Sequence, residues 1–440
     1  MPRARGVDAC LRAMSIIGYG CVMFVAGATV QHYRLPPAAF LSDAFLAFDA
    51  WYGVLTQASR SHPDHSQEAV QAAGEVRVHR QGALDGYTLL SYRASTTVHL
   101  VDMDGKTVHQ WSVPFQKAWP DPPHVHLRTK PRVSIDTAHV FPNGDLLIQY
   151  SGLGDTPYGY GLVKTDKDAN VLWKYAANAH HDFEVDPDTG NIYALTHSVL
   201  TSAEPGLDAL TYPLLTDSIV ILSPDGRELD RIPLLEAFRD SPFRDLLSRP
   251  ARFFKQENWD ALHTNSIRKV TADLAPQFPL FREGQVLVSV RNMNALAVID
   301  PTTRAVVWVW AAGGWKWQHS ARLLPNGHIL LLDNLGYRIK NRTYVRAIEL
   351  DPVARSVVWH FAGSPDLPLI SDKYGRVQRV RNGNTVIVVS KSGRVVEVSP
   401  FGELLWDYVA LSPSGKARTV VNGHRYEPSE VPFLSGRLTY

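Results

Sequence analysis

Residues 319–332 have the sequence His-Ser-Ala-Arg-Leu-Leu-Pro-Asn-Gly-His-Ile-Leu-Leu-Leu. Two short apolar stretches lie on either side of Pro-Asn-Gly, which is typical of a tight turn, so the segment predicts a β-hairpin. Related hairpins recur along the chain, and the polar residues that begin them are His139, His181, His263 and Arg376. The stretch Gly86–Tyr92 is a degenerate first copy.

A second type of hairpin alternates with the first and ends in tryptophan in five of its six copies. These tryptophans are Trp111, Trp173, Trp308, Trp359 and Trp406, and the sixth copy has Asp230 instead. Two hairpins make a four-stranded unit, and units of about 40–60 residues are typical of β-propellers. The sequence therefore predicts an all-β, six-bladed propeller in which the tryptophans pack between blades. Residues 234–259 fit no strand and predict short helices on a rim.

The N-terminus differs from the rest of the chain. Three arginines precede an uncharged run of 18 residues from Ala13 to Val30, close to the length that spans a bilayer. Because positive charge stays in the cytoplasm, we expect residues 1–34 to form a transmembrane signal anchor, with the body exported to the periplasm. A signal peptide cleaved near Ala26-Gly27-Ala28 is the main alternative, and a buried core helix is another.

The other domain boundaries follow from composition. Residues 35–79 predict a short amphipathic helix from Ala39 to Leu55, followed by a polar linker. We expect the propeller to occupy residues 80–415 and a C-terminal tail to occupy residues 416–440.

Composition and motifs exclude several classes of function. The 45 basic and 43 acidic residues leave a net charge of +2, which gives no electrostatic case for nucleic-acid binding. Both cysteines, Cys10 and Cys21, lie near the N-terminus, so the body has neither a disulfide nor a cysteine-based metal site. The chain has no glycine-rich phosphate loop, dinucleotide fingerprint or Gly-x-Ser-x-Gly elbow.

The propeller geometry brings polar residues together from distant parts of the chain. The first strand of each blade lines the channel, so His139, His181, His263, His319 and Arg376 should meet at one mouth. The residues seven positions after the turn glycines should join them, and these are Ser151, His197, Arg291, Asn334 and Ser390. Imidazole and guanidinium groups with few acids suit an oxyanion ligand.

Two other interpretations of the histidines stay open. A histidine in a channel is commonly a hydrogen-bonded structural residue. Imidazoles alone can also bind Zn²⁺ or Cu²⁺. The cation of Arg291 opposes a metal ion nearby, so we predict no metal site.

Five segments resemble the bacterial arylsulfotransferases, the phosphoadenosine-independent aryl sulfate sulfotransferases. The likeness covers roughly residues 80 to 410. The segments are His180-His-Asp-Phe-Glu-Val, Asp260-Ala-Leu-His-Thr-Asn-Ser-Ile, Leu287-Val-Ser-Val-Arg-Asn-Met-Asn, Gln318-His-Ser-Ala-Arg-Leu-Leu-Pro-Asn-Gly and Gln378-Arg-Val-Arg-Asn-Gly-Asn-Thr.

This resemblance implies a six-bladed propeller that moves a sulfuryl group from an aryl sulfate to a phenolic or other hydroxyl acceptor. It implies a sulfated histidine at His319 and no metal or organic cofactor. It also implies that His263, Thr264 and Asn265 contact the sulfate oxygens. Arg291 matches the sulfate-binding arginine and His181 matches the channel histidine. From the channel geometry, we expect the substrate to be surrounded also by His197, Asn334, His139 and Arg376.

The chain departs from the better-known members of that family. They have an N-terminal β domain and a disulfide, whereas this sequence has a membrane segment and no body cysteine. The sequence leaves open the donor, the acceptor and whether the protein is a homo-oligomer. The alternative function is that of a non-catalytic, membrane-anchored propeller that acts as a binding module or accessory subunit.

Overall fold

The structure is a computed structural model that describes residues 73–120, 132–153, 158–207, 210, 212–248, 260–311, 313–339, 342–364 and 367–435. The expectations for the signal anchor and the amphipathic helix lie outside these residues. Among the described residues, no helix is both long and apolar enough to cross a membrane.

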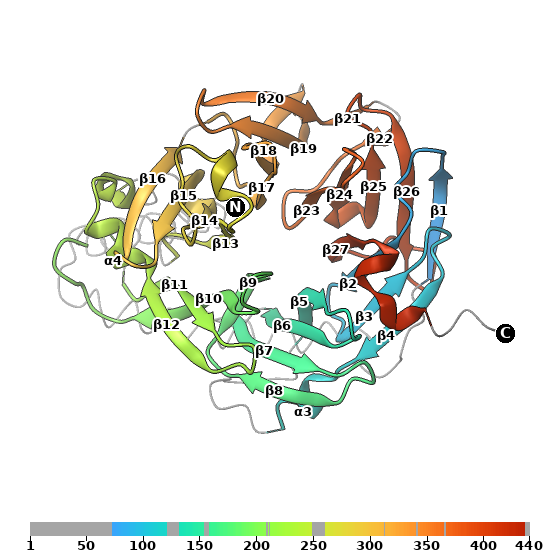
Figure 1. Ribbon diagram of the computed structural model, residues 1–440, viewed down its shortest axis with the longest axis horizontal. Coiled ribbons are helices and arrows are strands. Elements are labelled where there is room, and N and C mark those ends of the chain that lie inside the picture. Colours follow the sequence, from blue (N-terminus) through green and yellow to red (C-terminus); the bar gives the residue numbers. More distant parts are fainter. Residues whose placement is uncertain are drawn as a thin grey trace, which may run out of the picture. The chain divides into compact units, whose positions relative to one another are not determined.

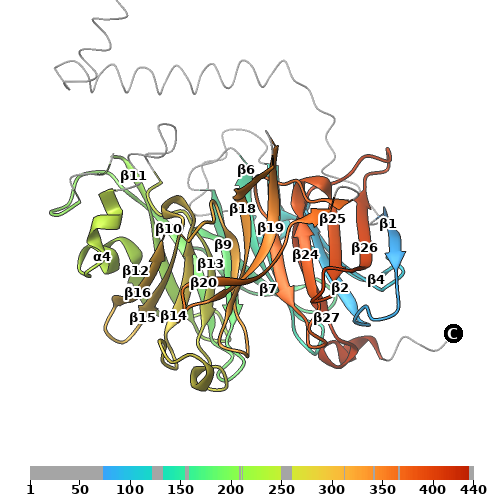
Figure 2. The same cartoon turned by 90° about the horizontal axis from the view of Figure 1, so that it is seen from above.

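Six antiparallel sheets surround a central channel, which confirms the predicted six-bladed β-propeller (Figure 1). Each blade has four strands, except that blade 6 has a fifth. From the channel outward, blade 1 has β27 (Val420–Tyr426), β2 (Tyr87–Tyr92), β3 (Thr97–Val101) and β4 (Thr107–Ser112), and blade 2 has β5 (Arg132–Val140), β6 (Leu146–Leu153), β7 (Gly159–Thr165) and β8 (Val171–Tyr175). In the view at right angles, the strands run between the two faces of the ring (Figure 2).

The other four blades follow in chain order. Blade 3 has β9 (Ala179–Val185), β10 (Ile192–Leu200), β11 (Leu214–Leu222) and β12 (Glu228–Pro233), and blade 4 has β13 (Thr264–Lys269), β14 (Val286–Val290), β15 (Ala295–Asp300) and β16 (Ala305–Ala311). Blade 5 has β17 (His319–Leu323), β18 (Ile329–Ile339), β19 (Arg342–Asp351) and β20 (Ser356–Phe361). Blade 6 has β23 (Arg376–Arg379), β24 (Thr385–Val389), β25 (Arg394–Val398), β26 (Leu404–Leu411) and β1 (Ala73–His79).

Short elements occupy the connections. The helix α4 (Leu234–Arg239) and the 3-10 turn η1 (Arg244–Ser248) confirm the helices predicted after residue 234. A further helix, α3 (Phe115–Ala118), follows β4, and a two-stranded ribbon of β21 (Gly363–Ser364) and β22 (Leu367–Pro368) precedes β23.

Strands of the propeller lie on both sides of the expected range 80–415. The degenerate copy at Gly86–Tyr92 contributes β2 but no innermost strand to blade 1, and β27 from the C-terminal part supplies it. The strand β1 pairs with β26 at the outside of blade 6. The tail expected over 416–440 and the linker expected before residue 80 therefore each contain a strand. A propeller closes only when its first and last blades are held together. Here β27 from the C-terminal part completes blade 1, and β1 from the N-terminal part extends blade 6.

The tryptophans at the blade ends join neighbouring blades, as predicted. The indole Nε1–H of four of the five donates to a backbone carbonyl in a turn of the next blade, and the fifth, Trp308, packs in an apolar cluster with Ile329 and Leu331 of blade 5. The pairs are Trp111 with Gly144 (3.1 Å), Trp173 with Pro224 (3.1 Å), Trp359 with Pro400 (2.8 Å) and Trp406 with Met103 (2.9 Å). Truncating a core tryptophan typically costs about 3–5 kcal/mol, so these contacts stabilise the ring strongly.

Candidate active site

A pocket of about 350 Å³, including its open mouth, lies where the innermost strands begin. Its lining combines cationic, imidazole and amide groups with one carboxyl group. The lining residues are Asp136, His181, Asn265, His319, Ser320, Tyr374, Gly375, Arg376 and Val421. They come from strands up to 285 positions apart, because each innermost strand contacts the next around the channel.

His319 is the first residue of β17, and its environment selects one tautomer. Its Nδ1 lies 2.9 Å from the carbonyl oxygen of Trp317 and 2.8 Å from Oδ1 of Asn334. The amide of Asn334 is oriented by a bond from its Nδ2 to the carbonyl of Tyr374, at 2.9 Å. Both partners of Nδ1 accept, so Nδ1 carries the hydrogen and Nε2 has the lone pair.

The imidazole of His319 is neutral over a wide pH range. Burial lowers its pKa to about 4, and the nearby charge of Arg291 lowers it in the same direction. A neutral imidazole with a free lone pair is a competent nucleophile.

Arg291 lies directly after β14, in the turn η3 (Arg291–Met293). Its guanidinium carbon lies 4.1 Å from the ring centre of Trp317, two residues before His319. Its charge also lowers the pKa of His263. Arg291 therefore acts electrostatically on both histidines, and its contact with a sulfate stays a prediction.

His263 precedes β13 and is oriented by a carboxylate that the sequence analysis did not assign. Oδ2 of Asp260 lies 2.5 Å from Nδ1 of His263, and Oδ1 accepts the backbone N–H of His263 at 3.1 Å. Burial and Arg291 lower the pKa of His263, while the Asp260 carboxylate favours the protonated form. Asp260 begins one of the quoted segments, three residues before His263, and that spacing was the available signal.

His181 lies between two other imidazoles, those of His263 and His180. Its ring centre lies 4.7 Å from that of His263, and its Nδ1 lies 2.8 Å from Nδ1 of His180. Burial, and then His263, lower the pKa of His181 well below its usual value. Both His181 and His263 have left-handed backbone, with φ of 55° and 50°. Such strain in residues other than glycine is concentrated at functional sites.

Two predicted contacts lie one layer behind the pocket. His197 stacks on His180, with 3.4 Å between ring centres, and its Nδ1 lies 3.1 Å from Oδ1 of Asp217. The backbone N–H of Thr264 donates to Oδ2 of Asp217 at 2.7 Å. Neither His197 nor Thr264 lines the pocket, and three further predicted residues that are close to its histidines are also outside its lining: His263, Arg291 and Asn334. His197 is on a second strand, and the first strand with His180 lies between it and the channel.

His180, His197 and Asp217 could offer ligands to a metal ion. In the described part of the chain, they form the group whose ligand atoms gather most closely, within 4.8 Å of one another. The two imidazole planes are stacked at 5°, so their lone pairs lie in parallel planes and do not converge on one point. Asp217 already accepts hydrogen bonds from His197 and Thr264, whereas Nε2 of His180 and Nε2 of His197 are buried without a hydrogen-bond partner. The absence of a metal stays a prediction.

Asn265 and Arg376 line the pocket as predicted, and both are held rigidly. Nδ2 of Asn265 donates to the carbonyl of Gln318 at 2.8 Å. Arg376 donates to Oδ1 of Asp182 at 2.8 Å and to the carbonyl of His181 at 3.1 Å. These contacts fix the polar wall that faces His319.

His139 does not line this pocket, in contrast to the expectation that it would meet the other histidines at the channel mouth. His139 lies near the end of β5, and its ring contacts Phe141 and Tyr426, with ring centres 4.9 Å and 6.4 Å apart. Asp136, three residues earlier, occupies the wall of the pocket instead. The strand β5 has nine residues and a bulge between Ile135 and Thr137, so equal spacing from the turn does not give equal depth.

Asp136 and Tyr374 are two further pocket residues that the sequence analysis missed. Burial raises the pKa of Asp136 to about 6, although a hydrogen bond with Ser151 and the charge of Arg376 act to lower it. Tyr374 lies in the connection before β23, where no repeat pattern points to it. Its hydroxyl accepts a hydrogen bond from Arg93 at 3.1 Å.

The sequence matches the family Arylsulfotransferase (ASST) over residues 137–410. No curated protein matches it significantly. Similar solved structures include a protein of unknown function from Bacteroides caccae, with 13% identity, a TM-score of 0.48 and 74% of this chain and 93% of that chain covered. Another is the β-propeller domain of Cps50 (Swd1) from Myceliophteria thermophila, with 13% identity, a TM-score of 0.41 and 80% and 97% covered.

Proposed function

The chain belongs to the arylsulfotransferase family, and from this premise we propose that it transfers a sulfuryl group from an aryl sulfate to a phenolic or other hydroxyl acceptor through a sulfohistidine at His319. One observation carries the proposal. Nδ1 of His319 donates to two acceptors, so the lone pair on Nε2 is available in a pocket beside a guanidinium group.

In the first half-reaction, Nε2 of His319 would attack the sulfur of the aryl sulfate. The Nε2–S bond forms, the bond from sulfur to the aryl oxygen breaks, and its electron pair leaves with the phenolate. The imidazole ring becomes positively charged, and the acceptors on Nδ1 stabilise that charge. This leaves the protein mainly the tasks of positioning and charge stabilisation.

The sulfuryl oxygens need hydrogen-bond donors throughout the transfer. Arg291 supplies a guanidinium group whose charge acts on His263 and His319. Asn265 and Arg376 line the same pocket. Sulfuryl transfer resembles phosphoryl transfer in this demand for preorganised positive charge around equatorial oxygens.

In the second half-reaction, the acceptor hydroxyl would lose its proton and attack the sulfur of sulfohistidine. The S–Nε2 bond breaks and its electron pair returns to His319. We assign the proton to His263, because Asp260 orients this imidazole and stabilises its protonated form. The same proton then passes to the phenolate that leaves in the next first half-reaction, so protons balance over the cycle.

The test is a mass measurement on the intact protein after incubation with an aryl sulfate such as 4-nitrophenyl sulfate and no acceptor. We expect one added sulfuryl group, and we expect the adduct and turnover to disappear in His319→Ala. The matched control is His360→Ala, because His360 is an exposed histidine on β20 of the same blade. Normal folding with no adduct from any aryl sulfate would instead favour a non-catalytic binding module.

A further inference from the structure

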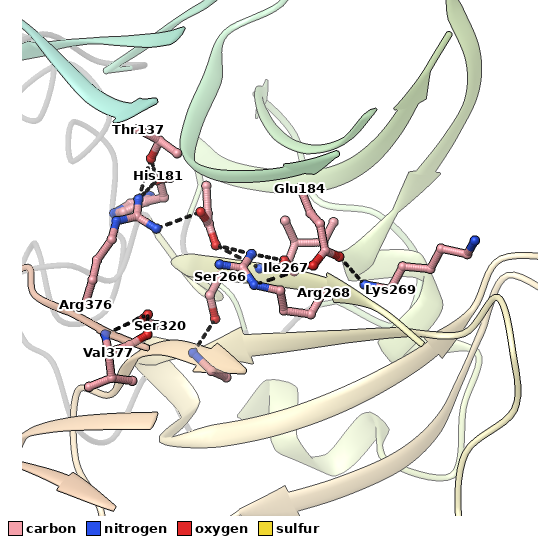
Figure 3. A network of polar contacts seen from close by, with 12 residues as sticks. Thr137, His181, Glu184, Ser266, Ile267, Arg268, Lys269, Ser320, Arg376 and Val377 are labelled. Carbon is pink, nitrogen blue, oxygen red and sulfur yellow. Dashed lines mark hydrogen bonds and ion pairs between the residues drawn. The ribbon is translucent and has the colours of Figure 1, made fainter. Parts of the chain in front are cut away.

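A second group of polar residues extends along the innermost strands from the His319 pocket, and Arg376 belongs to both. Three arginines from neighbouring innermost strands form it: Arg268 on β13, Arg322 on β17 and Arg376 on β23. We call these three residues the arginine tier. Figure 3 shows Arg268 and Arg376 approaching the same region from different strands, with Glu184 opposite Arg268. The charge of Arg322 acts on both of the other arginines and on Asp182 and Glu184.

The nearby carboxylates are already used by other groups. Asp182 binds Arg268 at 2.7 Å and Arg376 at 2.8 Å. Although burial acts to raise it, these guanidinium groups hold the pKa of Asp182 at about 2. Glu184 accepts the backbone N–H of Lys269 and lies 3.7 Å from Nε of Arg268. The tier thus has three guanidinium groups against two carboxyl groups.

Arg322 differs from Arg268 and Arg376, because it has no ion pair with a described carboxylate. No hydrogen bond or ion pair joins it to any residue in the described ranges, and its Nε is buried. Nε of Arg268 is also buried without a hydrogen-bond acceptor. Burial, and then the charge of Arg268, lower the pKa of Arg322 to about 9, so it is still charged at neutral pH. Arg322 is half-buried, and a charge that is partly removed from water without a paired group favours binding of a counter-charge.

The innermost strand β27 adds a hydrogen-bond donor to the tier, and Asp136 on β5 interacts with Arg376 in the wall of the His319 pocket. His424 on β27 interacts electrostatically with Arg322, His139, Arg268 and Arg376. Burial, and then Arg322, lower the pKa of His424 well below its usual value, so its imidazole is neutral. Nε2 of Gln378 donates to the carbonyl of Arg425 at 2.9 Å and lies 3.4 Å from Nε2 of His424. Nε2 of His424 therefore accepts, and its Nδ1 carries a hydrogen.

We propose that Arg322 and Arg268 of the arginine tier bind an oxyanion, sulfate or phosphate, at a site separate from the His319 pocket. The guanidinium group of Arg322 would hold it, with Nε–H of Arg268 and Nδ1–H of His424 as further donors. Arg322 and Arg268 do not line the His319 pocket, whereas Arg376, which does line it, is paired with Asp182. Guanidinium groups match the oxygens of tetrahedral anions with paired N–H donors.

The test is thermal unfolding of the full chain in sodium sulfate, sodium phosphate or sodium chloride at constant ionic strength. We expect sulfate or phosphate to raise the Tm by several degrees over chloride, as a ligand of the native state does. The rise should persist in Arg291→Gln, which weakens anion binding in the His319 pocket, and disappear in Arg322→Met. A rise that survives Arg322→Met, or that chloride reproduces, overturns the proposal.

A second comparison covers the case in which Arg322→Met alters packing. In chloride, Arg322→Met should unfold at or above the Tm of the unmodified protein, because it removes an unpaired charge. Arg322→Lys keeps the charge and should keep a weaker sulfate response. The control is Arg304→Met, which removes an exposed arginine paired with Asp230. A lower Tm of Arg322→Met in chloride, together with no sulfate response in Arg322→Lys, would contradict the site.

The same Tm measurements show which anion the site prefers. Equal responses to sulfate and phosphate indicate a general oxyanion site, and a response to sulfate alone indicates selectivity for sulfate.

Discussion

The two ring nitrogens of His319 have separate environments, and this separation determines what the residue can do. Nδ1 is bonded to Asn334 and to the carbonyl of Trp317, whereas Nε2 is left for the substrate. His263 shows the same division, with Asp260 on Nδ1. At this scale, function depends on neighbours that orient an imidazole as much as on the imidazole itself.

Asn334→Ala should slow formation of the sulfohistidine roughly 10- to 100-fold. The variant removes a hydrogen bond to a ring that becomes charged, and such a bond is worth about 1.5–3 kcal/mol. Rapid-quench mass spectrometry with an aryl sulfate measures the rate. Asn326→Ala is the control, because Asn326 is an asparagine of the same blade that binds Glu349 outside the pocket. An unchanged rate in Asn334→Ala would show that Asn334 does not orient His319.

The rate of the first half-reaction should stay high well below pH 6.5. Burial lowers the pKa of His319 to about 4, so the ring keeps its lone pair until the pH falls through that value. The acid limb of a pH–rate profile for adduct formation should therefore lie near pH 4. In Asn334→Asp, a carboxylate beside Nδ1 favours the protonated ring, so the limb should move to higher pH. A limb near 6.5 in the unmodified protein would contradict the burial of His319.

The strands of this propeller position the site through contacts between blades. Gln318, directly before β17, donates to the carbonyl of Ala295 at 2.9 Å in blade 4, and its own carbonyl accepts from Asn265. This contact places His319 and Asn265 side by side from different blades. Blade 6 meets blade 1 in a similar way, because Arg425 on β27 lies 3.2 Å from Glu397 on β25. Both of these side chains are fully buried.

Arg425→Ala should lower the free energy of unfolding by about 3–5 kcal/mol, because it leaves Glu397 buried without its counter-ion. Urea denaturation followed by circular dichroism measures this change. The double variant Arg425→Met with Glu397→Met removes both charges and should recover most of the stability. If the double variant is as unstable as Arg425→Ala, packing by Arg425 matters more than the ion pair.

The whole ring is closed by segments from both ends of the described chain. The C-terminal strand β27 is the innermost strand of blade 1, and the N-terminal strand β1 is the outermost strand of blade 6. The two positions are not equivalent. β27 pairs with β2 and contacts the innermost strands on either side, whereas β1 covers an edge of a blade that already has four strands.

Deleting residues 420–440 should abolish cooperative thermal unfolding, because it opens the channel wall and exposes the edge of β2. Starting the chain at residue 80 removes β1 and should lower the Tm while leaving one cooperative transition. Differential scanning calorimetry of both variants measures the difference. Equal effects of the two deletions would contradict the role of β27 as the closing strand.

Most of the fold was predictable from local patterns. Turn residues, alternating apolar strands and the spacing of the tryptophans were sufficient to predict six blades. The closing strands were not predictable in this way, because β1 and β27 are single strands outside the repeated hairpins. Four of the ten predicted site residues line the pocket: His181, Asn265, His319 and Arg376. The other six do not: His139, His197, His263, Thr264, Arg291 and Asn334.

The sequence by itself determined the blade number and the kinds of side chain that reach the channel, because both follow from short-range periodicity. Only the tertiary structure decided which of those side chains share one pocket. A bulge in β5 places Asp136 where His139 was expected, and His180 separates His197 from the channel. Depth in the channel depends on strand length, bulges and packing between blades, and these involve residues far apart in the chain. The tautomer of His319 has the same origin, since Asn334 and Trp317 orient it only after blade 5 has folded.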